Sequence, residues 1–269
     1  MLAALRLIHP APAAAVILLS AALGAILATQ AGLLLDERWV FVVLAVAGSQ
    51  IFTGATNDIA DRGRDEAARP EKPIPAGELS LNAAAWVASI GLALQLVASW
   101  QVGWLALALG AVASGSALAY NLALSRTPLS AVPYLVSFGV LPAWIAAGLG
   151  IPLERVLPAI PLVAPFAVAA HLANTIRDFE ADAIGGSRSM AQVLGRERSR
   201  LLAAGLALAV GLGVGGALLI GGRVAPASIG LGLIGLLGIV QGLPSERRLW
   251  YGILVAAVSW TAAWALSTS

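Results

Sequence analysis

The sequence predicts an all-α integral membrane protein, and two observations lead to this fold class. Of the 269 residues, 59% are hydrophobic and only 11% are charged, and the mean hydropathy is +0.88, far from the balance of a soluble domain. The apolar runs are also about 20 residues long, which suits membrane-spanning helices. Strands of a membrane β-barrel would instead alternate apolar and polar residues over ~10 positions. A bundle of transmembrane helices is therefore expected.

Nine apolar segments are expected to span the membrane. The first follows Arg6 and resembles the core of a signal peptide, but its apolar run continues to Leu35 and is long enough to span. The third and fourth are divided only by a Gln-Val-Gly break, so a count of eight stays open. The glycine-rich stretches GVGGALLIGG and GLGLIGLLG in the last third of the chain suit close helix packing in a bilayer. The expected spans are 11–33, 38–56, 82–102, 104–122, 130–149, 155–174, 199–219, 226–243 and 248–266.

The basic residues predict which side of the membrane each connection faces. With nine spans and a cytoplasmic N-terminus, 13 of the 16 Lys and Arg residues lie inside, and only Arg38, Arg155 and Arg223 lie outside. This asymmetry follows the positive-inside rule, so we expect a multi-pass protein of the inner (plasma) membrane. It also explains the pI near 9.5 without a nucleic-acid partner. Cysteine is absent, which excludes disulfides and thiolate chemistry.

Acidic residues concentrate in two cytoplasmic connections, which hold 10 of the 14 Asp and Glu residues. Motif one is NDIADRGRD at 57–65, and motif two is NTIRDFEAD at 174–182. Both place Asn, Asp and Asp at i, i+4 and i+8, so each set would share one face if the preceding helix continued. The sets are Asn57, Asp61 and Asp65, and Asn174, Asp178 and Asp182.

Four carboxylates near one another would repel strongly, so the two motifs together predict a site for divalent cations. Carboxylate and amide oxygens suit Mg²⁺, which takes its remaining ligands from water and substrate phosphates. The implied substrate is a diphosphate. The alternative is that Asn57 or Asp58 closes a turn and the loop acids are solvated. Two copies, each at the end of an apolar segment, favour the metal site.

Basic and polar residues near the motifs extend the predicted site. Prolines stiffen the loop after motif one, and this loop carries Arg69 and Lys72; Arg188 follows motif two in a comparable position. Those three are expected to contact a diphosphate, whereas Arg196, Arg198 and Arg200 are interpreted as ordinary positive-inside charges. Polar residues within spans are rarer. Those near the motifs are Tyr120, Asn121 and Arg126, expected as a wall of the site, and His171, either a cavity-lining donor or a hydrogen-bonded bundle residue.

NDIADRGRD followed by RPEKPIPAG, with NTIRDFEADAIGG later, resembles the UbiA superfamily of intramembrane prenyltransferases, and the resemblance covers nearly the whole chain. It implies a ring of nine transmembrane helices around a central cavity, with cytoplasmic cap loops. It also implies that both Asn-Asp-Asp sets hold Mg²⁺ ions that bridge to an isoprenyl diphosphate. Arg69, Lys72 and Arg188 match the family's diphosphate-contacting positions, and Arg6 is a further candidate. The family's usual Lys after a Tyr is replaced by Ser125, and Arg126 beside it is expected to take the place of that Lys in contacting the diphosphate.

The expected activity is transfer of an isoprenyl group to a lipophilic acceptor, expected to be aromatic, within the membrane. Several Arg and Lys residues would stabilise the leaving diphosphate, and an apolar bundle would keep water from the allylic cation. A membrane terpene cyclase and a transporter are the competing interpretations.

Residues 1–269 are expected to form a single domain of two related four-helix halves. Asp58 has no counterpart in motif two, where Thr175 stands, so it is placed behind the metal ligands.

Overall fold

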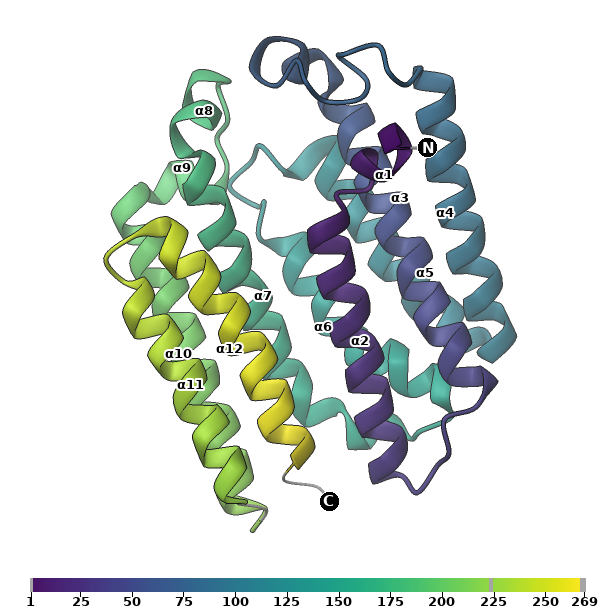
Figure 1. The fold of residues 1–269 in the computed structure, drawn as a ribbon, viewed down its shortest axis with the longest axis vertical. Helices are drawn as coiled ribbons and strands as arrows, with labels where there is room; N and C mark the ends of the chain where they lie inside the picture. The colour runs from purple at the N-terminus through teal and green to yellow at the C-terminus, as the bar shows by residue number, and fades with distance from the viewer. Residues whose placement is uncertain (1, 223–224, 267–269) are drawn as a thin grey trace. The chain divides into compact units, whose positions relative to one another are not determined.

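The computed structural model describes residues 2–222 and 225–266, and every regular element within them is a helix (Figure 1). The expected all-α class is confirmed. Arg223, expected on the outer side of the membrane, lies outside the described residues.

Eight helical segments of the described chain are long and apolar enough to cross a membrane. The segment expected at 226–243 forms the helix Pro226–Gly242, which at 17 residues is shorter than the eight. The multi-pass membrane class is therefore confirmed, and the count of nine spans stays a prediction. The eight segments are Pro10–Gln30, Glu37–Ala68, Leu81–Val102, Trp104–Leu124, Val132–Leu149, Leu153–Asp178, Arg196–Ile220 and Glu246–Leu266.

The third and fourth expected spans are separate helices, α4 (Leu81–Val102) and α5 (Trp104–Ala119). Gly103 between them has a φ of 127°, a conformation that residues with a Cβ rarely adopt. The alternative in which these two segments form one span is therefore wrong.

Packing divides the chain into two compact units. Unit 1 runs to Ser125 and includes Val140–Leu157, and unit 2 comprises Arg126–Gly139 and the chain from Pro158 onward. The expected single domain with two related halves stays a prediction.

Unit 1 is organised around α3, which packs against its neighbours α2, α4 and α5. Asp36 caps the start of α3 by accepting a hydrogen bond from the Arg38 N–H, and Ser80 caps α4 in the same way through the Ala83 N–H. Apolar residues of the first five helices and of the second part of α6 fill the core. The elements are α1 (Leu2–Leu7), α2 (Pro10–Gln30), α3 (Glu37–Ala68), α4, α5, the π-helix η1 (Tyr120–Leu124), the second part of α6 (Val132–Leu149) and the 3₁₀ helix η2 (Leu153–Arg155), after which η3 (Leu157–Ala159) follows.

Unit 2 packs α7 against α10 and pairs α11 with α12, which run side by side (Figure 1). Its core includes Leu172, Ile176, Leu249 and Ile253, each almost completely buried. The elements after the first part of α6 are α7 (Ile160–Thr175), the 3₁₀ helix η4 (Ile176–Asp178), α8 (Phe179–Ile184), α9 (Met190–Leu194), α10 (Arg196–Ile220), α11 (Pro226–Gly242) and α12 (Glu246–Leu266).

Glycines let helices approach closely within unit 1. A methyl group at Gly48 of α3 would lie 2.5 Å from the backbone nitrogen of Gln95 and 2.6 Å from the carbonyl oxygen of Gly91, both on α4. The backbones of α3 and α4 therefore approach too closely for a side chain, the arrangement that small residues permit in membrane bundles.

We predict that Gly48→Ala lowers the melting temperature of the protein in detergent, because the added methyl group must push α3 and α4 apart at a cost of ~1–3 kcal/mol. Gly63→Ala is the matched control, since Gly63 lies on the same helix and a methyl group there meets nothing within 4 Å. The control should be neutral or stabilising, by up to ~1 kcal/mol. Equal melting temperatures for the two variants would contradict close packing at Gly48.

Candidate functional site

Motif one lies on the last turns of α3, which continues without a break to Ala68. The expectation that the preceding span extends through the motif as a helix is confirmed. Asn57, Asp61 and Asp65 therefore follow one another at about one turn along the same side of α3, with the drift of ~40° that four residues produce.

A lysine bridges two carboxylates of motif one. The ammonium nitrogen of Lys72 lies 2.8 Å from Asp58 Oδ1 and 2.7 Å from Asp65 Oδ2. Asp58 and Asp65 are both buried, at 3% and 5% exposure. Buried carboxylates need a partner of opposite charge, and Lys72 supplies it to both.

The remaining groups of motif one are also engaged. The Arg64 guanidinium donates to Asp61 Oδ1, and the Arg69 N–H donates to the Asp65 carbonyl oxygen at the end of α3. Arg69 and Lys72, both expected to contact a diphosphate, thus lie in a loop attached directly to the motif.

The end of the fourth expected span lies against motif one, within the same unit. Asn121 donates from Nδ2 to the carbonyl oxygen of Thr53 (3.0 Å) and to the hydroxyl of Thr56 (2.8 Å). Its Oδ1 accepts a hydrogen bond of 3.3 Å from Asn57 Nδ2. Tyr120 and Asn121 begin the π-helix η1, an irregularity that is frequent at functional sites.

Motif two is not one continuous α-helix. The α-helix α7 ends at Thr175, a 3₁₀ turn covers Ile176–Asp178, and α8 begins at Phe179. A shared face for Asn174, Asp178 and Asp182 on one α-helix is therefore a wrong expectation, because a 3₁₀ turn advances by three residues per turn instead of 3.6. The turn keeps Ile176 fully buried in the unit 2 core, while Asn174 and Asp178 are exposed.

Two arginine side chains and one glutamine side chain hold motif two in place. Arg177 lies over the Trp250 ring at 5.7 Å, and Gln192 donates a 2.6 Å hydrogen bond to the Phe179 carbonyl oxygen. Arg196 lies over the Phe179 ring and pairs with Glu180 of the motif. These contacts anchor α8 to the rest of unit 2.

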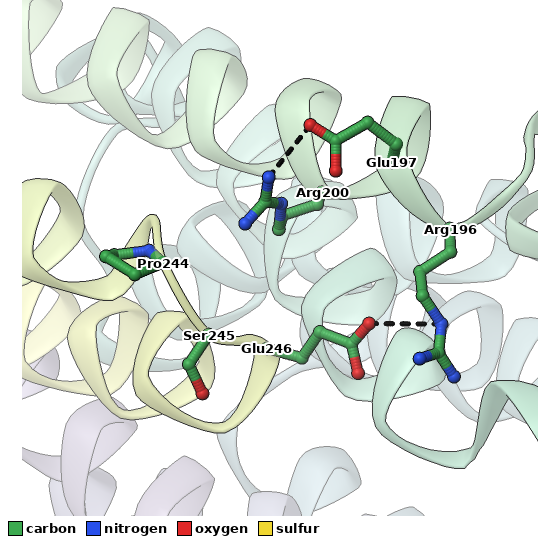
Figure 2. A pocket seen from close by; sticks show the side chains of 6 residues that line it. All are labelled: Arg196, Glu197, Arg200, Pro244, Ser245 and Glu246. Atoms are coloured by element: carbon green, nitrogen blue, oxygen red, sulfur yellow. Dashed lines mark hydrogen bonds and ion pairs between the residues drawn. The ribbon is translucent and has the colours of Figure 1, made fainter.

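Arg196 also borders a polar surface pocket of about 310 Å³ at the starts of α10 and α12. Figure 2 shows its ion pair with Glu246, 3.2 Å long, and the pair between Arg200 and Glu197. Their positions in the sequence predict that Arg196 and Arg200 are ordinary positive-inside charges. The structure gives both of them specific acidic partners. Helix spacing (i, i+3) accounts for the pair between Arg200 and Glu197, whereas Arg196 pairs with Glu180 and Glu246, which lie far from it in the sequence.

Arg126 and Arg188, both expected to contact a diphosphate, lie together in unit 2. Arg126 donates from Nη2 to the carbonyl oxygen of Gly185 (2.7 Å), and the Arg188 N–H donates to the Arg126 carbonyl oxygen (3.0 Å). The segment before α6 is thus fastened to the loop that follows motif two.

His171 has the environment of a hydrogen-bonded bundle residue, one of its two expected roles. It is buried, its Nε2 lies 3.1 Å from the Ser130 hydroxyl, and its ring lies 4.4 Å from that of Tyr134. Ser130 also accepts a hydrogen bond from the Met190 N–H. The short segment before α6 is thereby connected to α7 and α9.

The oxygen ligands of the two motifs suit Mg²⁺ in kind, because they are carboxylates and amide carbonyls and include no nitrogen or sulfur ligand. Within the described residues, no three His, Cys, Asp or Glu side chains converge on one point. In motif one the cations Lys72 and Arg64 instead occupy the carboxylates. The oxygen ligands of the motifs thus suit a magnesium ion chemically, and in this structure the carboxylates of motif one pair with lysine and arginine.

Comparison with known proteins places this arrangement in context. Residues 17–249 match the sequence model of the UbiA prenyltransferase family. The digeranylgeranylglyceryl phosphate synthase of Methanoculleus marisnigri is 31% identical over 172 residues, which cover 61% of this chain and 58% of the relative. The enzyme of the same name from Natronomonas pharaonis is 28% identical, over 65% of this chain and 63% of the relative. The alignment thus spans about three fifths of these relatives.

Solved structures share the fold. A UbiA homolog from Archaeoglobus fulgidus, bound to DMAPP and Mg²⁺, has a TM-score of 0.75 with 18% identity, covering 98% of this chain and 99% of that one. A UbiA homolog from Aeropyrum pernix K1 without ligands has a TM-score of 0.73 with 19% identity, covering 92% and 96%. At these identities the likeness is one of fold.

We predict that Ser130→Ala lowers the melting temperature, because the Met190 N–H and the buried His171 both lose a partner, at a cost of ~1–3 kcal/mol. Ser20→Ala is the matched control: Ser20 is also buried, and its hydroxyl makes no hydrogen bond. Differential scanning fluorimetry in detergent compares the two. A control as destabilised as Ser130→Ala would show that the hydrogen bonds of Ser130 contribute nothing specific.

Proposed function

This chain belongs to the UbiA prenyltransferase family, and from that premise we propose that it transfers an isoprenyl group from an isoprenyl diphosphate to a lipophilic acceptor within the membrane. The observation that carries the proposal is the charge arrangement at the end of α3. Two buried carboxylates there share one ammonium group, and a third pairs with a guanidinium. Carboxylates and positively charged side chains arranged in this way at the end of an apolar helix suit the binding of a metal-bound diphosphate.

We propose that each motif supplies three ligands for magnesium. Motif one contributes Asn57, Asp61 and Asp65, and motif two contributes Asn174, Asp178 and Asp182. Mg²⁺, when bound, would neutralise negative charge that develops on the departing diphosphate. Solved UbiA homologs bound to GPP or DMAPP together with Mg²⁺ support this cofactor.

The basic residues beside the motifs are proposed to stabilise the leaving diphosphate. Arg69 and Lys72 adjoin motif one, and Arg126 and Arg188 adjoin motif two. As the allylic C–O bond breaks, the diphosphate keeps the electron pair, and fixed cations near its oxygens lower the barrier. Arg6 is a further candidate, and its guanidinium pairs with the Glu78 carboxylate.

The acceptor would add to the carbon from which diphosphate leaves and then lose a proton. The names of the curated relatives support an acceptor of the glyceryl phosphate type, and an aromatic acceptor is the second class to test. In either case the apolar surroundings of the helices would exclude water from the cation.

The proposed location is the inner (plasma) membrane, with the N-terminus and both motifs on the cytoplasmic side. The placement of 13 of the 16 Lys and Arg residues on one side supports it. Side chains along α4, such as Trp86, Ile90 and Val97, are strongly exposed, as lipid-facing positions should be.

We predict that Asp61→Ala reduces Mg²⁺-dependent diphosphate release by at least about a hundredfold, because ligand and charge are lost where the leaving group must be stabilised. The assay uses purified protein with isoprenyl diphosphates of several chain lengths and either a glyceryl phosphate lipid or an aromatic acceptor. Mass spectrometry identifies the product.

Glu154→Gln is the control, since this exposed acid lies in η2 and belongs to neither motif, and it should leave release unchanged. Unaltered release by Asp61→Ala would contradict the proposal. A cyclic hydrocarbon or alcohol formed without acceptor would show that the chain is a cyclase instead.

A further inference from the structure

The segment before α2 carries an unusual residue that contacts motif one. His9 has φ 50° and ψ 69°, and it is the only residue other than glycine with positive φ in the described chain. Residues with a Cβ avoid this conformation unless the surroundings enforce it. From this position the His9 ring nitrogen Nε2 donates to Asp58 Oδ1 at 3.0 Å.

The contact partner of His9 is the oxygen that holds Lys72. Asp58 Oδ1 accepts from His9 Nε2 and from Lys72 Nζ, which lie 3.0 and 2.8 Å away. Asp58 is 3% exposed, so its carboxylate depends on these two donors instead of on water. The chain His9, Asp58, Lys72 and Asp65 thus connects the N-terminal segment to a proposed magnesium ligand.

Packing fixes the N-terminal segment on both sides of this chain of contacts. A methyl group at Gly54 of α3 would lie 2.9 Å from three backbone atoms of Ile8, so the segment lies directly on the helix. Leu7 is completely buried beside Phe52 and Ala55. α1 packs against α3 and α4 (Figure 1).

Arg6 connects the same segment to the loop that carries Lys72. Its guanidinium pairs with the Glu78 carboxylate at 2.9 Å and donates to the Glu71 carbonyl oxygen. The segment Arg6–His9 therefore contacts α3, the motif one carboxylate and the loop, and we call it the N-terminal clip.

We propose that His9 is a positioning residue, which acts through Asp58 to hold the Lys72 ammonium at motif one, ready to meet a diphosphate. The kinetic part of this inference rests on the proposed function. Asp58 is then an anchor for Lys72 and not a metal ligand, and the strained backbone of His9 is maintained because it brings the ring to Asp58.

The sequence offers an activity-independent readout, because Lys72 is the only lysine in the chain. Its side chain is 13% exposed, and an ammonium held by two carboxylates reacts slowly with acylating reagents. Mass spectrometry of substrate-free, full-length protein treated with a water-soluble N-hydroxysuccinimide ester follows acylation of the Lys72 peptide alone.

We predict that His9→Ala raises the rate of Lys72 acylation about fivefold, the factor typical of one lost hydrogen bond. His9→Gln, whose amide can still donate to Asp58, should label at the rate of the unchanged protein. Both variants retain a Cβ, so both bear the same backbone strain. Asn tolerates the left-handed conformation, but its side chain is too short to reach Asp58. Lys72 should therefore be acylated in His9→Asn at the raised rate expected for His9→Ala, which keeps the test valid should His9→Ala fold poorly.

The Asp58→Ala background, which removes both side-chain oxygens, separates action through Asp58 from a general loosening. There, His9→Ala should add no further increase in Lys72 acylation. Unchanged acylation in both His9→Ala and His9→Asn, or an equal increase with and without Asp58, would overturn the inference.

Kinetics then examine the consequence for the proposed reaction. His9→Ala should raise the KM for isoprenyl diphosphate about fivefold, with a smaller change in kcat, and His9→Gln should restore KM. An unaltered KM would overturn the positioning role. If the unchanged protein transfers no prenyl group, the proposed function fails, and the acylation rates still decide whether the clip holds Lys72.

Discussion

The carboxylates at the end of α3 must be balanced by positive charge, and the surrounding structure depends on this constraint. Asp58 and Asp65 are buried, and Asp61 lies between them along the helix. Removing the only partner of a buried charge costs ~3–5 kcal/mol. Lys72 meets that demand for two carboxylates at once, because an ammonium is a compact charge with several donors. A divalent cation would meet the same demand, which is why the cluster suits a magnesium-dependent reaction.

This constraint explains features that otherwise have no connection. The proline-rich loop after α3 returns Lys72 to the helix it has just left, and Arg6 fixes that loop through Glu78. His9 adopts a left-handed backbone, which costs roughly 1–2 kcal/mol, while its ring supplies the second donor to Asp58. Gly54 gives the N-terminal segment room to lie on α3. Local strain is thus retained beside the residues proposed to bind substrate, as is common at functional sites.

The sequence predicted what depends on hydrophobic length and on spacing along one helix. It predicted the helical membrane class, the continuation of α3 through motif one, and the proximity of Asn121 to that motif. It did not predict the 3₁₀ turn in motif two, where Ile176 is buried in the core, because the spacing of the acids carries no signal for such a turn. His9 contacts Asp58, which is 49 positions away, and Arg196 contacts Glu246, which is 50 positions away. Spacing along the sequence carries no signal for such distant pairs.

The central claim is that the acids of motif one bind an isoprenyl diphosphate through Mg²⁺. Calorimetric titration of the protein in lipid nanodiscs with an unreactive isoprenyl thiolodiphosphate tests it most directly, because binding is then measured without turnover. We expect saturable binding that requires Mg²⁺ and is lost in Asp65→Asn, which removes one charge and a proposed ligand. Binding of equal strength in excess EDTA, or unchanged binding by Asp65→Asn, would contradict it.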